Sequence, residues 1–125
     1  MFESPPAPEI STGEVAPAIE GGATVIDVRE PDEFATGHIP RARPMPLGEV
    51  LELTTKLDPS KPVYVICAVG GRSMAAAGAL RQLGFDAISI TGGTSAWASE
   101  GRPIATGSSQ SWGANRPAES GSTSC

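Results

Sequence analysis

The sequence predicts an α/β fold, a small parallel sheet with helices on both faces. Segments that favour strands alternate along the chain with segments that favour helices, and this order is typical of parallel sheets with helical crossovers. The run Val63–Ile66 has β-branched and aromatic residues and no charge, as expected of a strand buried on both faces. With 125 residues, 39% of them apolar and 18% charged, the chain suits one compact domain.

The first predicted elements form scaffold. Residues 1–8 are rich in proline and predict a flexible lead-in, and residues 9–11 predict a short strand at the edge of the sheet. Ser11 and Glu14 have the spacing of a capping box, which predicts a brief helix that ends at the glycines of residues 21–22.

The next predicted strand, residues 24–27, is followed by a short helix. Pro31 is acceptable in the first turn of that helix. Residues 44–46 predict an extended stretch. Residues 47–57 show a roughly helical recurrence of apolar side chains, at Leu47, Val50, Leu51, Leu53 and Leu57.

Cys67 follows the strand 63–66 and precedes another predicted helix. The short loop between them contains Gly70 and Gly71, and Ser73 is expected to cap the helix. An apolar stripe is expected at Ala76, Ala77, Leu80 and Leu83, with the C-cap at Gly84. Cys67 is therefore predicted at the carboxyl end of a strand, facing a helix N-terminus.

This position favours an anion at Cys67, because unpaired N–H groups and the positive end of the helix dipole meet there. Gly70 and Gly71 permit backbone angles that residues with a β-carbon resist, so successive N–H groups along residues 69–73 can form an anion-holding nest. With Arg72 nearby, such surroundings lower the pKa of a cysteine, and the thiolate is the nucleophile. A free cysteine is often only a small buried hydrophobe, but the glycines, the guanidinium and the helix start favour a reactive one.

Asp27 and His38 each have two interpretations. Asp27, at the end of a strand, either acts in catalysis or pairs with Arg29 or caps the next helix. His38 is either a general base for Cys67 or a hydrogen-bonded residue of a turn. We favour the structural role for both, because a thiolate stabilised by dipoles needs neither a second carboxylate nor a base.

The last predicted elements are a strand at residues 85–90 and a helix at residues 94–100. Trp97 on this helix is expected in the core, where an aromatic side chain on a terminal helix usually packs. Residues 105–125 are rich in small polar residues and predict a flexible tail. Cys125 at its end is either inert or a resolving thiol for the active cysteine, and its spacing gives no support for the second.

Three segments, in order, resemble the rhodanese family. The loop that begins at Cys67 resembles the active-site loop of the family. Four residues separate Cys67 from Arg72, which is similar to the spacing in the sulfur-transferring members, whereas related phosphatases have one residue more between cysteine and arginine. Residues 27–42 contain Asp-x-Arg, Glu-Phe and Gly-His-Ile-Pro-Arg-Ala, similar to a second family pattern, with Arg41 where the family usually has glycine. Residues 85–97 resemble the final strand, Gly-Gly pair and tryptophan-bearing helix.

The resemblance implies a rhodanese-like fold over residues 9–104 and a sulfurtransferase activity. In that chemistry Cys67 takes a sulfane sulfur from thiosulfate or a persulfide donor and passes it to a low-molecular-weight thiol, cyanide or a protein thiol. The residues expected to bind the donor are Val69, Gly70, Gly71, Arg72 and Ser73. Structural support is expected from Asp27, Arg29 and His38, and neither a cofactor nor a metal is expected.

Other functions stay open. A persulfide carrier or a non-catalytic rhodanese-like binding module would have the same sequence features, whereas the short loop disfavours a phosphatase or an arsenate reductase. Rhodaneses that handle thiosulfate well often have cations inside the loop, where this chain has the neutral Ala68 and Val69. A persulfide or polysulfide is therefore an alternative donor.

Composition limits the partners. The formal net charge of −5 provides no basic stripe for nucleic acid, and no apolar run approaches the length needed to cross a membrane. The first residues lack the long apolar region of a secretory signal, so we expect a cytoplasmic location. The two cysteines match neither a disulfide framework nor a zinc site. We expect a monomer or weak dimer.

Overall fold

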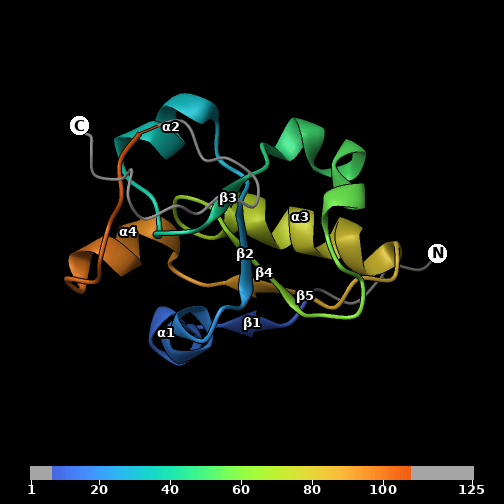
Figure 1. Ribbon diagram of the computed structural model, residues 1–125, viewed down its shortest axis with the longest axis horizontal. Coiled ribbons are helices and arrows are strands. Elements are labelled where there is room, and N and C mark those ends of the chain that lie inside the picture. The colour runs from blue at the N-terminus through green and yellow to red at the C-terminus, as the bar shows by residue number, and fades with distance from the viewer. Residues whose placement is uncertain (1–6, 108–125) are drawn as a thin grey trace.

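The computed structural model describes residues 7–107, which form a five-stranded parallel sheet with helices on both sides (Figure 1). The strands lie in the order β1–β5–β4–β2–β3, and every neighbouring pair is parallel. The strands are β1 (Glu9–Ile10), β2 (Thr24–Asp27), β3 (Arg43–Pro44), β4 (Val63–Ile66) and β5 (Ala87–Ile90). The helices are α1 (Thr12–Glu20), α2 (Pro31–Thr36), α3 (Gly71–Gln82) and α4 (Gly93–Ser99), with two 3₁₀ segments, η1 (Leu47–Glu52) and η2 (Thr54–Lys56). The predicted fold class is confirmed.

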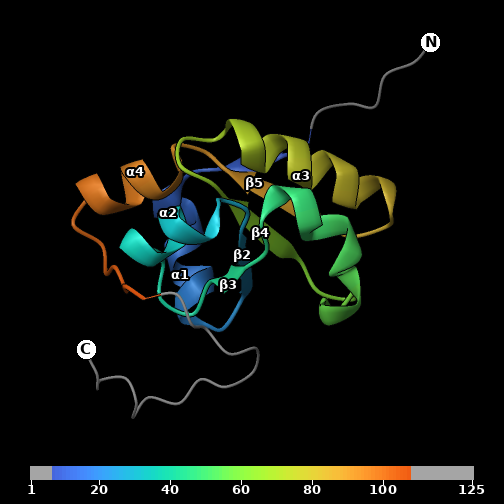
Figure 2. The same cartoon turned by 90° about the horizontal axis from the view of Figure 1, so that it is seen from above.

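The two faces of the sheet carry separate hydrophobic cores, because successive side chains of a strand point to opposite faces. Ile26 and Val65 lie in the core beneath α3, η1 and the end of η2. Their neighbours Val25 and Ile66 lie in the other core, with side chains of α1, α2 and α4. Figure 2 shows α3 on one side of the strands and α1 and α4 on the other. Both faces of the central strand β4 are thus covered.

Local signals placed the first elements correctly. The side chain of Ser11 accepts a hydrogen bond from the Glu14 N–H at 3.2 Å, and the Glu14 carboxylate accepts one from the Ser11 N–H at 3.1 Å, as the capping box predicts. The strands expected at residues 24–27 and 63–66 have the predicted bounds. Trp97 is 4% exposed and belongs to the core, as expected.

The roughly helical recurrence over residues 47–57 does not produce an α-helix. The chain instead forms the 3₁₀ segments η1 and η2, and Leu51 is 51% exposed. The reason lies in the spacing of Leu47, Val50 and Leu53. Residues three apart stand directly above one another in a 3₁₀ helix, and this spacing turns all three side chains toward the core.

The start of α3 also differs from the prediction. Gly70 is the N-cap, and Ser73 lies inside the first turn with its side chain fully buried, so Ser73 does not cap the helix. Gly70 has φ +126°, a backbone conformation that favours glycine, whereas Gly71 is an ordinary helical residue. At the other end the structure corrects two predictions. Leu83, predicted in the apolar stripe, is 56% exposed, and Leu83 rather than Gly84 is the C-cap, with Gly84 following it at φ +98°.

Ala7 is buried in the core, and Ala105 pairs with His38 in an antiparallel bridge, so both ends of the described chain pack against the domain. The predicted lead-in before residue 7 and the tail after residue 107, including Cys125, lie outside the described residues. Within the described part of the chain, none of the helices has the length and apolar character that crossing a membrane requires.

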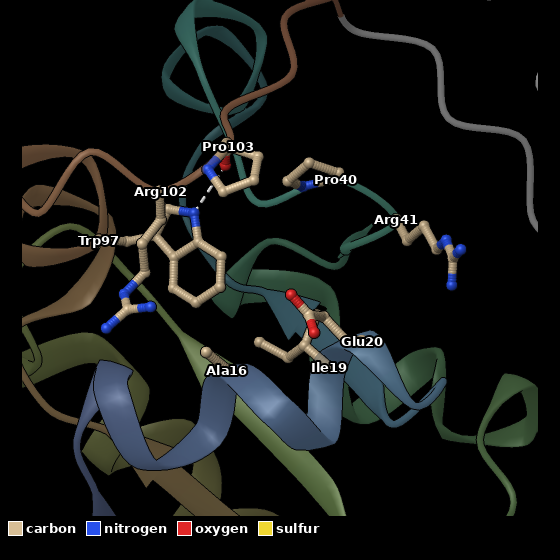
Figure 3. A pocket seen from close by; sticks show the side chains of 8 residues that line it. All are labelled: Ala16, Ile19, Glu20, Pro40, Arg41, Trp97, Arg102 and Pro103. Atoms are coloured by element: carbon tan, nitrogen blue, oxygen red, sulfur yellow. Dashed lines mark hydrogen bonds between the residues drawn. The ribbon is translucent and has the colours of Figure 1, made fainter.

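A pocket of about 230 Å³ lies between α1, α4, the turn at residues 40–41 and the segment at residues 102–103 (Figure 3). Its lining residues are Ala16, Ile19, Glu20, Pro40, Arg41, Trp97, Arg102 and Pro103. Arg41 has φ +75°, which explains why glycine would suit this turn, and its side chain is exposed. The pocket borders the end of α1 and the turn before β3, which is the amino-terminal edge of the sheet and not the edge that carries Cys67.

Candidate active site

The strand order predicts a crevice at the carboxyl ends of β2 and β4, which are neighbours in the sheet. After β2 the chain continues through α2 to β3, and after β4 it continues through α3 to β5, on the opposite face and in the opposite direction. Diverging loops of this kind leave the ligand-binding crevice of open α/β sheets. Asp27 ends β2 and Cys67 follows β4 at this crevice.

The sulfur of Cys67 lies in a ring of hydrogen-bond donors. The backbone N–H groups of Gly70 and Ser73 donate to Sγ at 3.1 and 3.2 Å, and Cys67 is only 1% exposed. Burial acts to raise the pKa of the thiol. The Ser73 side chain and the N–H groups of Ser73, Gly70 and Val69 outweigh burial and hold the Cys67 pKa below its ordinary value. The loop therefore favours a thiolate.

The start of α4 holds this loop from outside. The N–H of Thr94 donates to the Cys67 carbonyl at 2.9 Å, and the N–H of Ser95 donates to the Ala68 carbonyl at 3.0 Å. Gly93 lies so close to both carbonyls that a β-carbon there would collide with them. With its carbonyl oxygens fixed toward α4, the loop presents N–H groups to Sγ.

Ser73 is tied to the neighbouring strand as well as to the loop. Its hydroxyl lies 2.8 Å from the hydroxyl of Ser89 on β5, and both residues are fully buried. The Ser73 hydroxyl also donates a hydrogen bond to the Gly70 carbonyl at 3.1 Å. Because buried hydroxyls need partners, Ser89 fixes the orientation of the side chain of Ser73, whose backbone N–H donates to Sγ.

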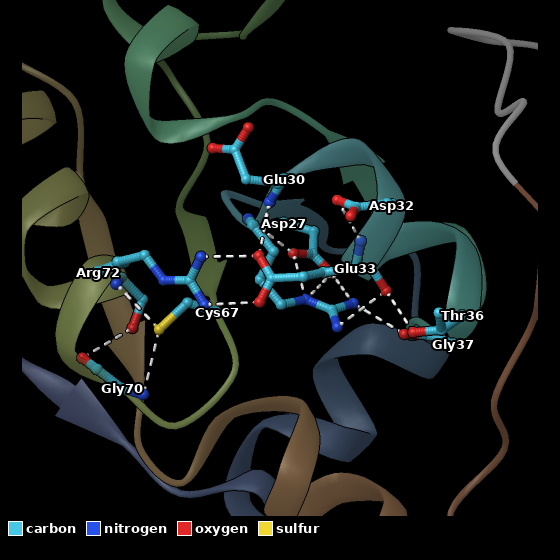
Figure 4. Close-up of polar contacts among 11 residues, drawn as sticks. Asp27, Glu30, Asp32, Glu33, Thr36, Gly37, Cys67, Gly70 and Arg72 are labelled. Carbon is cyan, nitrogen blue, oxygen red and sulfur yellow. Dashed lines mark hydrogen bonds and ion pairs between the residues drawn. The ribbon is translucent and has the colours of Figure 1, made fainter.

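Arg72 and Glu33 point toward one another and are hydrogen-bonded (Figure 4). Nη1 and Nη2 of Arg72 donate to the two carboxylate oxygens of Glu33 at 2.8 and 3.0 Å. The hydrogen bond from Arg72, with a second from the N–H of Glu30, lowers the pKa of Glu33 to about 2. Glu33 comes from α2 and Arg72 from α3, so the pair connects the two helices that diverge from the crevice.

Asp27 and Arg29 form a second pair beneath the first. Nε and Nη2 of Arg29 donate to the Asp27 carboxylate at 2.9 and 2.8 Å. Arg29 also donates to the carbonyl oxygens of Glu33 and Gly37 at 3.2 and 2.8 Å, which fixes the path of α2. Both side chains are buried.

His38 lies at the far end of α2 from the crevice. Its Nδ1 is 2.8 Å from the Phe34 carbonyl, and its ring stacks on the Phe34 ring with centroids 3.7 Å apart. Burial lowers the pKa of His38, so the neutral ring is favoured at neutral pH. No described contact joins His38 to Cys67, and a structural role stays the prediction.

The structure thus brings together the predicted loop residues and places Asp27 and Arg29 directly beside them, but not His38. Sequence reasoning missed Glu33 and Ser89. Ser89 left a signal, since a hydroxyl within the apolar strand Ala87–Ile90 requires a buried partner. The partner of Arg72 left none, because α2 and α3 meet only in the folded chain.

The fold and the loop define a compact α/β domain in which Cys67, with its pKa lowered by the loop, lies at a helix N-terminus and at the carboxyl edge of a parallel sheet. The family model described as the rhodanese-like domain matches residues 11–100. The chain belongs to this family.

Relatives and a solved structure agree with this assignment. Thiosulfate sulfurtransferase GlpE of Pseudomonas aeruginosa is 38% identical over 81 residues, which are 64% of this chain and 74% of that protein. Rhodanese-like/PpiC domain-containing protein 12, chloroplastic, of Arabidopsis thaliana is 40% identical over 86 residues, 65% of this chain but only 29% of that protein. The crystal structure of a rhodanese-related protein from Thermoplasma volcanium superposes with a TM-score of 0.74 at 37% identity, covering 78% of this chain and 97% of that one.

Proposed function

We propose that this protein is a sulfurtransferase that moves a sulfane sulfur from a donor to a thiol or cyanide through a persulfide on Cys67. The observation that carries the proposal is the Sγ atom with hydrogen bonds from two backbone N–H groups and a lowered pKa. The similarity to a protein named as a thiosulfate sulfurtransferase supports it.

In the first half-reaction the Cys67 thiolate attacks the outer sulfur of the donor. With thiosulfate, a new S–S bond forms to Sγ, the donor's S–S bond breaks, and sulfite leaves with the electron pair. In the second half-reaction the acceptor attacks the outer sulfur of the persulfide and restores the thiolate. Covalent catalysis of this kind divides one transfer into two steps and gives ping-pong kinetics.

The loop stabilises the persulfide as well as the thiolate. The N–H groups of Gly71 and Arg72 begin α3 and have no acceptor within the helix, so they are available to the outer sulfur. Preorganised donors of this kind are worth about 3 kcal/mol each in oxyanion holes. The near-complete burial of Cys67 restricts attack to a terminal sulfur atom that enters the loop, and Arg72 on the first turn of α3 contributes a positive charge.

Intact-protein mass spectrometry tests the proposal. Wild-type protein incubated with thiosulfate is expected to gain the mass of one sulfur and to lose it with cyanide, while Cys67→Ser gains none. If Cys67→Ser still turned over, the persulfide mechanism would be wrong. A persulfide that forms but is not discharged over many cycles by free cyanide or thiols identifies a carrier for a specific protein instead. No gain from thiosulfate or from an organic persulfide contradicts the transferase.

A further inference from the structure

Glu33 is hydrogen-bonded to Arg72, the arginine of the predicted donor loop. The two carboxylate oxygens of Glu33 accept hydrogen bonds from Nη1 and Nη2 of Arg72. An anionic sulfur donor that binds to these two nitrogens must therefore displace the Glu33 carboxylate. Both side chains remain about one-third exposed, 37% for Arg72 and 36% for Glu33, and therefore face whatever enters the crevice.

The surroundings do not restore the positive charge that Glu33 cancels. The first turn of α2 and its N-cap add the carboxylates of Glu30 and Asp32, whereas the loop from Ala68 to Gly71 carries no charge. The buried pair of Asp27 and Arg29 is neutral as a unit. Among the described contacts, the Glu33 carboxylate thus offsets the charge of Arg72, and a thiolate at Cys67 adds a further negative charge.

We propose that Glu33 is a specificity-determining residue that disfavours dianionic donors such as thiosulfate and favours organic persulfides, whose organic group need carry no charge. This inference rests on the proposed sulfur transfer and names the donor class for the same site. A sulfonate group brought to Arg72 meets the Glu33 carboxylate at once, and like charges repel more strongly as solvent is excluded. An uncharged organic group meets no such penalty.

The transfer from an organic persulfide balances without another reactant. The Cys67 thiolate attacks the terminal sulfur of R–S–SH and forms a new S–S bond. The donor's S–S bond breaks, and the inner sulfur leaves with the electron pair as the thiolate RS⁻. The proton stays on the transferred sulfur, so Cys67 ends as Cys–S–SH.

The experiment compares two donors that differ in charge, with cyanide as the common acceptor. We would measure kcat/KM for thiosulfate and for 2-hydroxyethyl hydropersulfide with the wild type, Glu33→Gln and Glu20→Gln. Gln keeps an oxygen that can accept from the Glu30 N–H, so the start of α2 is retained. Glu20 is an exposed carboxylate at the amino-terminal edge of the sheet and controls for the change in total charge.

Glu33→Gln is expected to raise kcat/KM for thiosulfate about tenfold at low salt and to change that for the persulfide less than twofold. High salt should reduce the increase in kcat/KM for thiosulfate. Glu20→Gln should have the same ratio of kcat/KM for the two donors as the wild type. Glu33→Asp keeps the charge and is expected to keep the wild-type preference. It also serves as the variant for comparison if Glu33→Gln unfolds.

Equal changes for both donors, or no change for thiosulfate, would overturn the role of Glu33. So would a Glu33→Asp variant that prefers thiosulfate, since shape rather than charge would then decide. Failure of the proposed function has a different signature. In that case the mass spectrum shows no sulfur on wild-type Cys67 with either donor. Neither donor then gives a measurable kcat/KM.

Discussion

The two arginine–carboxylate pairs beside Cys67 have the same shortest nitrogen–oxygen distance and very different exposure to solvent. Arg29 and Asp27 approach to 2.8 Å, and their side chains are 6% and 0% exposed. Arg72 and Glu33 also approach to 2.8 Å, but are 37% and 36% exposed. Bond length alone therefore does not tell which pair supports the fold and which one a ligand meets.

Removal from water makes the difference. A buried charge whose partner is deleted remains in a low-dielectric interior, and this loss costs about 3–5 kcal/mol. An exposed pair is screened by solvent and is worth about 0–1 kcal/mol. The inner pair is thus fixed scaffold for the loops after β2, while the outer pair can be rearranged by a donor at little cost to the fold.

The largest expected effect is on stability, at the inner pair. Arg29→Ala leaves Asp27 buried without its partner and removes the hydrogen bonds to the Glu33 and Gly37 carbonyls. We expect the free energy of unfolding to fall by about 3–5 kcal/mol, as measured by urea denaturation. Arg72→Ala is the matched control and is expected to lose no more than about 1 kcal/mol.

A loss below about 1 kcal/mol for Arg29→Ala would remove the contrast between the pairs. Asp27→Asn then separates the two interpretations of Asp27. If folded Asp27→Asn still forms the Cys67 persulfide at the wild-type rate, Asp27 is structural. A folded variant that has lost persulfide formation would make Asp27 part of the chemistry.

The inner pair also shows what a sequence can reveal. Asp27 and Arg29 are two residues apart, and their pairing was one of the expected outcomes. The strands, the capping box of α1 and the position of Cys67 before a helix likewise follow from patterns within about ten residues. These local features could be predicted because each is satisfied by near neighbours in the chain.

The features that could not be predicted depend on distant segments. Glu33 and Arg72 are 39 positions apart, and only the packing of α2 and α3 around the crevice brings them together. Serine is a common N-cap residue, but the Ser73 hydroxyl has a buried hydrogen-bond partner in Ser89 on β5. The N-cap of the helix is the earlier residue Gly70. Tertiary contacts override local propensity at these positions.

The next effect concerns donor binding, at the outer pair. Arg72→Ala removes the cation of the predicted donor loop and leaves Glu33 without its ion-pair partner. We expect KM for thiosulfate to rise about tenfold, equivalent to about 1.4 kcal/mol, in steady-state assays of thiocyanate formation. Arg72→Lys keeps the charge but not the two parallel bonds, and an intermediate KM is expected. An unchanged KM in Arg72→Ala would exclude Arg72 from donor binding.

A smaller effect is the pH dependence of the outer pair. Hydrogen bonds from Arg72 and the Glu30 N–H lower the pKa of Glu33 from 4.5 to about 2. A carboxyl with a lower pKa in the folded state contributes stability above its unfolded pKa, and this contribution is lost as the pH falls through the folded pKa. The contribution of Glu33 should therefore be complete above pH 4.5 and be lost between there and about pH 2.

Urea denaturation of the wild type and Glu33→Gln at several pH values checks this. The stability difference between the two proteins should shrink as the pH falls, and it should stay below about 1 kcal/mol because the pair is partly exposed. A difference that is constant with pH would mean that the carboxylate charge contributes nothing. A difference of several kcal/mol would mean that the pair behaves like the buried one.

The smallest effect is expected at a third pair, which is exposed like the outer one but far from Cys67. Arg102 donates to Glu100 at 2.8 Å with exposures of 31% and 41%, and its guanidinium lies 5.5 Å from the centre of the Trp97 ring. Glu100 keeps a 2.6 Å hydrogen bond from Thr12 in the Arg102→Ala variant, so no buried charge is stranded. We expect a stability change within about 1 kcal/mol and unchanged kcat/KM for both donors. A changed donor preference in Arg102→Ala would show that net charge anywhere on the surface, rather than charge at the crevice, selects the donor.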